Sequence, residues 1–201
     1  MPTHPDLLRD QLARRPRTAR QLAETLDVSQ PTISRALAAL GDEIVRFGAA
    51  RAIQYTRRDT SRGLPEIAIY RVDAEGRLRQ LGILVPVCPE GFVMRQVDGV
   101  ALHSDGLPWW LYDMRPQGYL GRAYAARHGA ELQLPARLLD WNDTHALKAL
   151  LAHGGDGIGN LLLGDAARDQ FLATPLPEPI TADRKAATYA QLARDAAQGE
   201  I

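Results

Sequence analysis

The sequence predicts an α+β protein in which a small helical region with one β-hairpin precedes an antiparallel sheet and further helices. Three observations carry this prediction. Residues 19–40 hold two short stretches with apolar residues at helical spacing, separated by a polar break. Residues 44–56 show two short strand-like runs around a glycine-containing turn. From residue 66 the apolar period changes to two, which is typical of half-buried strands.

Residues 19–40 predict two helices that cross through a tight turn. Thr18 is a suitable N-cap for the first helix and Ser29 for the second, because their hydroxyls can accept a backbone hydrogen bond. Ala23 is small at the point where the two helices must approach closely. Asp27 occupies the turn and can adopt the left-handed backbone conformation that the turn needs.

The second of these helices carries its polar residues away from its apolar stripe, which comprises Ile33, Leu37 and Leu40. Short polar side chains and arginine are the types that contact base edges and phosphates in DNA. An ordinary helical hairpin with a solvated second helix is the alternative. The candidate DNA contacts of this helix are Ser29, Gln30, Thr32, Ser34 and Arg35.

The pattern L-x-V-S-Q-P-T-I-S-R-x-L, which begins at Leu26, resembles the helix-turn-helix of winged-helix transcription regulators. It departs from that family at Asp27, where glycine is frequent. The resemblance implies sequence-specific binding of double-stranded DNA by the second helix. It also implies a β-hairpin wing directly after the helix.

The predicted wing consists of strands over residues 44–47 and 52–56, joined by residues 48–51. Arg51 stands at or near its tip and is the first candidate for a wing contact with DNA. Arg57 and Arg58 follow the second strand and are candidate contacts with the phosphate backbone. Solvated surface arginines are the equally good alternative for each.

The charge distribution agrees with a nucleic-acid-binding front end. The 201-residue chain has a formal net charge of zero, but residues 1–62 hold 11 arginines against 7 acidic residues. Cys88 is the single cysteine, which excludes a disulfide framework and a cysteine metal cluster. The sequence shows no signal peptide and no apolar run of about 18 residues. We therefore expect a cytoplasmic protein that does not bind membranes.

Residues 60–63 are polar and turn-forming, which predicts a winged-helix domain over residues 1–60 and a second domain over residues 64–201. The second domain begins with a three-stranded antiparallel meander, whose first hairpin turns at residues 73–76. Helices, and one short strand, are expected after the meander. The predicted strands cover 66–72, 77–87, 92–97 and 160–163, and the predicted helices cover 118–128, 144–153 and 183–197.

The segments PWWLYDMRPQGYLGR and HGGDGIGNLLLGD resemble the N-terminal subdomain of HipA-like serine/threonine kinases. The most similar branch is the YjjJ-type, whose members carry a winged helix ahead of that subdomain. The resemblance implies a toxin–antitoxin relative that binds a HipA-like kinase core, in cis or in trans. The glycine- and serine-rich ATP loop, catalytic aspartate and metal-binding residues of that core have no counterpart here. We expect no catalytic residues, cofactor or metal in this chain.

Three functions stay open. The first is a DNA-binding autoregulator or neutralising partner of a HipA-like kinase, and the second is the non-catalytic N-terminal portion of such a kinase toxin. The third is a stand-alone winged-helix regulator with a ligand-sensing second domain. A partner-binding domain should keep an aromatic surface, and a homodimer would use the same surface. The predicted interface residues are Trp109, Trp110 and Tyr112.

Two other sites are weaker predictions. Residues 155–159, with three glycines, suggest a nucleotide loop, but they lack the G-x-G-x-x-G spacing and a P-loop lysine. A turn between helix and strand is the better interpretation. The set His103, Asp105 and Asp113 matches no metal-binding spacing.

Overall fold

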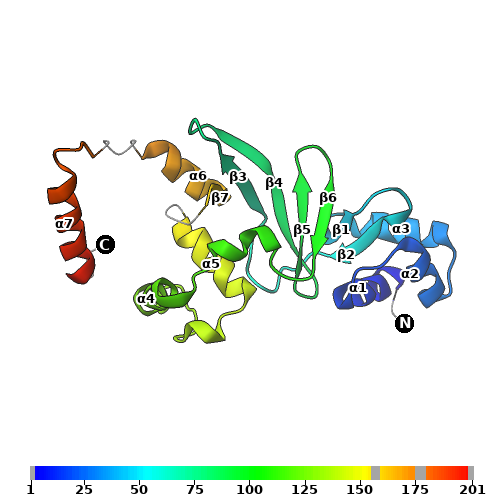
Figure 1. Cartoon of the computed structure of the whole chain (residues 1–201). Helices are drawn as coiled ribbons and strands as arrows, with labels where there is room; N and C mark the ends of the chain where they lie inside the picture. The colour runs from blue at the N-terminus through cyan, green and yellow to red at the C-terminus, as the bar shows by residue number, and fades with distance from the viewer. Residues whose placement is uncertain (1–2, 155–158, 175–179, 199–201) are drawn as a thin grey trace. The chain divides into compact units, whose positions relative to one another are not determined.

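The computed structural model describes residues 3–154, 159–174 and 180–198. It confirms the α+β class, with N-terminal helices and a hairpin followed by an antiparallel sheet and further helices (Figure 1). The chain divides into two compact units, one ending at Phe171 and one beginning at Leu172. The features described below for the winged helix and the sheet all lie in the first unit.

The N-terminal region contains the helices α1 (His4–Arg14), α2 (Ala19–Leu26) and α3 (Gln30–Leu40). Thr18 caps α2 as predicted, because its hydroxyl accepts the Gln21 backbone N–H at 3.2 Å. Ser29 does precede α3, but its side chain forms no cap with a backbone N–H. The three helices bury one apolar cluster, built mainly from Leu8, Leu12, Leu22, Ile33, Leu37 and Leu40.

The turn between α2 and α3 has the geometry that a helix-turn-helix requires. Asp27 adopts the left-handed conformation, with φ 52° and ψ 47°, as the sequence predicted. The Val28 backbone N–H then returns to the carbonyl of Ala23 at 3.1 Å. This closing bond satisfies a carbonyl at the end of α2 and fixes the direction in which α3 begins.

The wing hairpin pairs β1 (Ile44–Phe47) with β2 (Gln54–Arg57). The second strand was predicted to start at residue 52, and this is wrong, because residues 50–52 form a 3₁₀ turn. The segment that connects α1 to α2 also pairs with the hairpin. The Tyr55 N–H donates to the Arg17 carbonyl at 2.8 Å, and the reverse bond measures 2.9 Å. The hairpin is thereby fixed to the helices.

The middle of the chain forms a five-stranded antiparallel sheet in the order β6-β5-β4-β3-β7. The prediction of a three-stranded meander was therefore incomplete. A fourth strand follows the turn at Gly99, and the predicted strand near residue 162 pairs with β3. The strands are β3 (Ile67–Val72), β4 (Leu78–Val87), β5 (Gly91–Gln96), β6 (Ala101–Ser104) and β7 (Leu161–Leu163).

One face of this sheet packs against a 3₁₀ helix, η3 (Trp109–Met114), and against α5 (Asp143–His153). The helix α4 (Gly118–His128) follows η3 and matches its predicted bounds. The predicted helix from residue 144 is α5, which begins one residue earlier. The core on this face includes Ile69, Leu84, Phe92, Leu111, Leu147 and Leu163.

The opposite face of the sheet is covered by two different elements. Val45 and Phe47 of the wing pack on Val85, Val87 and Val93. The helix α6 (Gly164–Ala173), which the sequence analysis did not predict, packs against β3 and β7 farther along the same face. The winged helix and the sheet therefore share a buried core.

The second unit contains the predicted C-terminal helix, α7 (Lys185–Gln198). Two interactions lie within this helix: the Gln191 amide donates to Asp195 at 2.6 Å, and the Lys185 ammonium lies 5.5 Å from the Tyr189 ring centroid. Tyr189 and Leu192 of this helix are largely exposed.

Candidate nucleic-acid and partner interfaces

The helix α3 has two distinct faces, as a recognition helix requires. Ile33 and Leu37 are buried against α1 and α2. Gln30, Ser34 and Arg35 are exposed on the other side of the helix, and Thr32 is half-buried at its edge. The structure thus brings the predicted contacts of this helix together on one short surface near its N-terminus.

Two local interactions organise this surface. The Arg35 Nε donates to the Pro31 carbonyl one turn earlier, at 3.3 Å. Within the described residues, the Arg35 guanidinium has no other hydrogen-bond or ion-pair partner, so its terminal nitrogens can donate to an external acceptor. The hydroxyls of Ser29 and Thr32 lie 3.0 Å apart and hydrogen-bond to each other.

The wing arginines differ in their surroundings. Arg51 is exposed in the loop of the hairpin. The charge of Arg57 acts on the nearby Glu43 carboxylate. Hydrogen bonding from Arg9 is the main cause that lowers the pKa of Glu43, and the positive charge of Arg57 lowers this pKa further. Arg58 is already engaged, because it donates to the Asp42 carbonyl at 3.0 Å and forms an ion pair with Glu66. A phosphate that binds Arg58 would have to compete with these two partners. Arg51 forms no comparable interaction with the described residues.

Other arginines of the basic front end are neutralised locally. Arg9 binds Glu43 through two nitrogens, each 2.8 Å from a carboxylate oxygen. Arg14 and Arg20 form ion pairs of 2.8 Å with acidic residues four positions away on their own helices. Fewer arginines of this region therefore carry an unpaired positive charge than the count from the sequence suggests.

The predicted partner residues lie in and around η3. The Trp109 side chain is 80 % exposed, whereas Trp110 is half-buried against the core between the sheet and α5. Tyr112 is 45 % exposed, and the Arg115 guanidinium lies 4.7 Å from its ring centroid. Buried Leu111 and Met114 hold η3 on the protein, so its aromatic side chains are presented from a fixed support.

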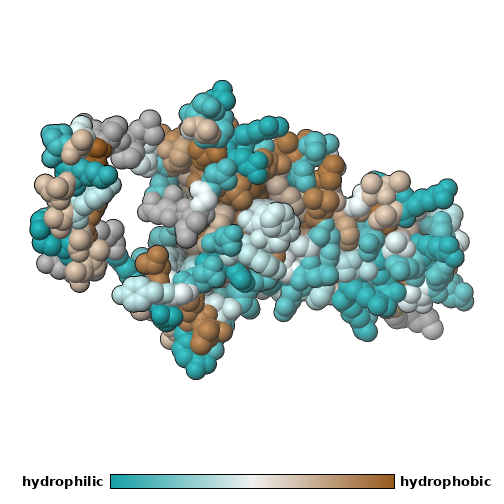
Figure 2. Space-filling view, viewed as in Figure 1, coloured by the Kyte–Doolittle hydropathy of each residue, from teal (hydrophilic) through white to brown (hydrophobic). Residues whose placement is uncertain are grey.

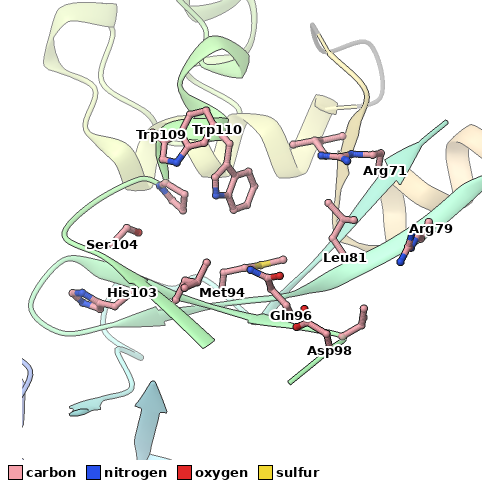
Figure 3. A pocket seen from close by; sticks show the side chains of 14 residues that line it. Arg71, Arg79, Leu81, Met94, Gln96, Asp98, His103, Ser104, Trp109 and Trp110 are labelled. Atoms are coloured by element: carbon pink, nitrogen blue, oxygen red, sulfur yellow. The ribbon is translucent and has the colours of Figure 1, made fainter. Parts of the chain in front are cut away.

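A groove of about 650 Å³ lies between η3 and the sheet. Figure 3 shows the two tryptophans on one side of it and side chains of the strands on the other. Figure 2 shows hydrophobic surface gathered over the central strands, whereas the N-terminal helices are mostly hydrophilic. The lining includes Arg71, Arg79, Leu81, Met94, Leu102 and Leu161.

The sequence analysis did not assign a role to Arg71 and Arg79. The hairpin turn predicted at residues 73–76 would place Arg71 opposite Leu78, whereas the structure pairs Arg71 with Arg79. What the sequence could not show is that η3 returns over the same end of the sheet and turns that surface into a groove.

The remaining chemical candidates add no further site. Within the described residues, no three His, Cys, Asp or Glu side chains are placed to hold a metal ion. His103 and Asp105 approach to 3.6 Å. Burial raises the pKa of the Cys88 thiol. Most of the nucleotide-loop segment, residues 155–158, lies outside the described residues. No helix in the described part of the chain is long and apolar enough to span a membrane.

Residues 64–172, more than half of the chain, match the family described as the YjjJ-like toxin, middle domain. This chain belongs to the YjjJ-like toxin family. Residues 10–43 of this YjjJ-like chain match the arsR family of bacterial regulatory proteins, a match that includes α2 and α3. Both matches agree with the predicted order of a helix-turn-helix followed by a YjjJ-type domain.

The YjjJ-like chain is also 37 % identical, over 195 residues, to the protein named Toxin YjjJ from Escherichia coli strain K12. The aligned region covers 96 % of this chain but only 44 % of that protein. The chain thus spans less than half the length of the curated relative. No solved structure is significantly similar to it. We conclude that the chain is a DNA-binding, toxin-related protein of the helix-turn-helix type.

Proposed function

We propose that this chain binds operator DNA through α3 and the wing, and that its middle domain docks on a HipA-like kinase core, in cis or in trans. The observation that carries the DNA-binding part is the exposed polar surface of α3. The terminal nitrogens of Arg35 have no partner in the described part of the chain, while the opposite face of the same helix is buried.

The chemistry of this surface suits the major groove. The N-terminal residues of a recognition helix contact base edges, and Gln30, Ser34 and Arg35 all lie in the first two turns of α3. Arginine pairs with guanine and glutamine with adenine through two hydrogen bonds each. No acidic residue occupies the first turn of α3, so the positive end of the helix is open to a phosphate.

The wing supplies a second, less specific contact. Arg51 is exposed in the loop of the hairpin, and an arginine of a wing can enter an adjacent minor groove and respond to its width. Loss of Arg51 should weaken binding to all sequences, whereas loss of Arg35 should also relax sequence preference. Selection of binding sites from random duplex DNA by the parent and the two variants would reveal this difference.

The proposed kinase surface is the aromatic face of η3 that includes the exposed Trp109 and Tyr112 and the half-buried Trp110. Exposed aromatic residues on a fixed support are typical hot spots of protein interfaces. Trp109→Ala should therefore weaken binding to a HipA-like kinase core by about 2 kcal/mol or more, with little change in melting temperature. The loss should appear as reduced co-purification with the co-expressed core. Unchanged co-purification would contradict the docking role. A homodimer through this face would appear as a dimer of the free chain.

A second candidate function is the non-catalytic front part of a longer kinase toxin. It is favoured by the alignment, in which the chain covers only 44 % of Toxin YjjJ. In either case we expect this chain alone to incorporate no phosphate from labelled ATP and magnesium, because phosphoryl transfer needs a phosphate-binding loop and metal-holding carboxylates. Incorporation above a buffer control would contradict both candidates. The reading frame that adjoins the gene distinguishes them.

A further inference from the structure

The two arginines of the groove are an unusual pair. Arg71 of β3 and Arg79 of β4 lie directly opposite each other in the strand register, and both are exposed. Like charges opposite each other on neighbouring strands destabilise a sheet. Within the described residues, neither arginine has an acidic partner, whereas nearby Arg77 is bound to Asp73 at 2.9 Å and to Glu75 at 3.0 Å.

A β-bulge places this pair on the groove side of the sheet. Ile69 pairs with Gly82 but Tyr70 pairs with Gln80, so Leu81 is the extra residue on β4. The bulge shifts the alternation of β4, which turns Leu81 and Arg79 toward the groove. A Cβ atom at Gly82 would lie 2.1 Å from the Arg95 carbonyl oxygen, so only glycine fits at this position.

The groove therefore combines two chemical regions. One end carries two guanidinium groups without a described counter-charge, and the remainder is floored by Leu81, Met94 and Leu102 and bordered by tryptophan. Leu102 and Val97, which also lines the groove, are both exposed. An occupant must offer a large apolar group together with an anion.

We propose that this groove binds an acidic peptide segment of a partner protein. A side-chain carboxylate of the segment lies between Arg71 and Arg79, and a large apolar side chain of the segment packs against Trp109 and Trp110. Charge complementarity selects the occupant, because guanidinium groups bind carboxylates through paired hydrogen bonds. The inference rests on the proposed role of this face as a partner surface, and it adds the chemistry of the partner.

The lining favours a peptide over a single-stranded nucleic acid. Nucleic-acid grooves carry positive charge along their length, together with several aromatic platforms for the bases. Here the two arginines lie at one end of the groove (Figure 3), Asp98 is also part of the lining, and the floor is aliphatic. An aliphatic floor with a few convergent polar groups is typical of sites that bind apolar side chains or small apolar ligands.

The test is a selection of short random peptides, displayed on phage, against the full chain. We expect the enriched peptides to combine Asp or Glu with an aromatic or large aliphatic residue. A synthetic, fluorescein-labelled copy of the most enriched peptide should bind the parent. Arg71→Glu, Arg79→Glu or Trp109→Ala should each weaken it roughly tenfold or more. Arg77→Glu, on the same hairpin but outside the groove, is the matched control and should bind like the parent.

A second measurement, the melting temperature, distinguishes a loss of peptide binding from a loss of folding. Because Arg71 and Arg79 repel each other in the free protein, Arg79→Gln should raise the melting temperature slightly while it weakens peptide binding. Enriched peptides without acidic residues, unchanged affinity in Arg71→Glu, or displacement of the peptide by a single-stranded oligonucleotide would each overturn the inference. Retained co-purification with a kinase core in these same cases would leave the proposed docking role intact and reject only the acidic-peptide groove.

Discussion

The imidazole ring of His103 in β6 stacks on the ring of Phe47 in the wing, with centroids 4.7 Å apart and planes inclined by 15°. Next to this pair, the Gly48 N–H donates to the Ala101 carbonyl at 3.1 Å. Phe47 also belongs to the core that the wing shares with β4 and β5. The wing hairpin is thus part of the same packed structure as the middle domain.

Removal of the Phe47 ring should destabilise the winged helix and the sheet together. The residue is 7 % exposed, and Phe→Ala substitutions in cores typically cost about 3–5 kcal/mol. We expect Phe47→Ala to lower the urea midpoint in a single transition, observed alike by helical circular dichroism and by tryptophan fluorescence. Leu139→Ala, at a position that is 94 % exposed, is the control and should change little. Two separate transitions in the parent would contradict the shared core.

His103 should make stability depend on pH in the range near neutrality. Burial lowers the pKa of its imidazole, and the charge of Asp105 only partly offsets this effect. Its Nε2 is buried and has no hydrogen-bond partner among the residues that the structure describes. The unfolded chain therefore binds a proton first as the pH falls below about 6.5. The contribution of the neutral His103 ring to the free energy of unfolding is therefore fully present above that pH. It declines as the pH falls further, until the folded state also binds the proton.

The measurement is the difference in melting temperature between about pH 7.5 and pH 5.5, above and below the ordinary histidine pKa. His103→Phe keeps an aromatic ring against Phe47 but cannot titrate, so it should lose less stability on acidification than the parent. Equal losses in parent and variant would show that His103 does not contribute to the pH dependence.

Arg62 should be the most important ion-pair residue for folding. Its side chain is 12 % exposed and binds Asp59, which is 4 % exposed, at 2.7 Å. It also donates to the backbone carbonyls of Val87, Glu90 and Gly91. Loss of one partner of a buried pair leaves an uncompensated charge, so Arg62→Ala should cost about 3–5 kcal/mol in chemical denaturation.

The control for Arg62 is Arg14→Ala. Arg14 pairs with Asp10 at 2.8 Å, but its side chain is 70 % exposed, and such surface pairs contribute little to stability. Similar losses for the two variants would show that the contacts of Arg62 are not the reason for its effect.

The sequence predicted local features well and long-range pairing less well. The crossing of α2 and α3 follows from capping and apolar spacing within about twenty residues, and Asp27 indeed adopts the left-handed conformation. The pairing of β7 with β3 joins Leu162 to Tyr70, which no local pattern can indicate. The helix α6 was missed because its alanines and charged residues give only a weak apolar stripe.

The same distinction applies to the candidate sites. The residues of α3 are neighbours in the sequence, so helical spacing alone places them on one surface. Arg58 was predicted as a DNA contact from its charge, but its ion pair with Glu66 depends on the packing of the wing against the next segment. The side of the sheet that Arg79 shares with the rest of β4 depends on the bulge at Leu81, and such a bulge is not visible in the apolar pattern.

Fluorescence anisotropy with a labelled duplex from the chain's own promoter measures whether α3 contacts the bases of DNA. Arg35→Ala should weaken binding to the cognate duplex by about 1–3 kcal/mol. Arg20→Ala is the matched control, because Arg20 is an exposed arginine of α2 that is paired with Glu24 at 2.8 Å. We predict that Arg20→Ala binds nearly as tightly as the parent. Equal affinity of Arg35→Ala and the parent for the cognate duplex would contradict the assignment of α3 as the recognition helix.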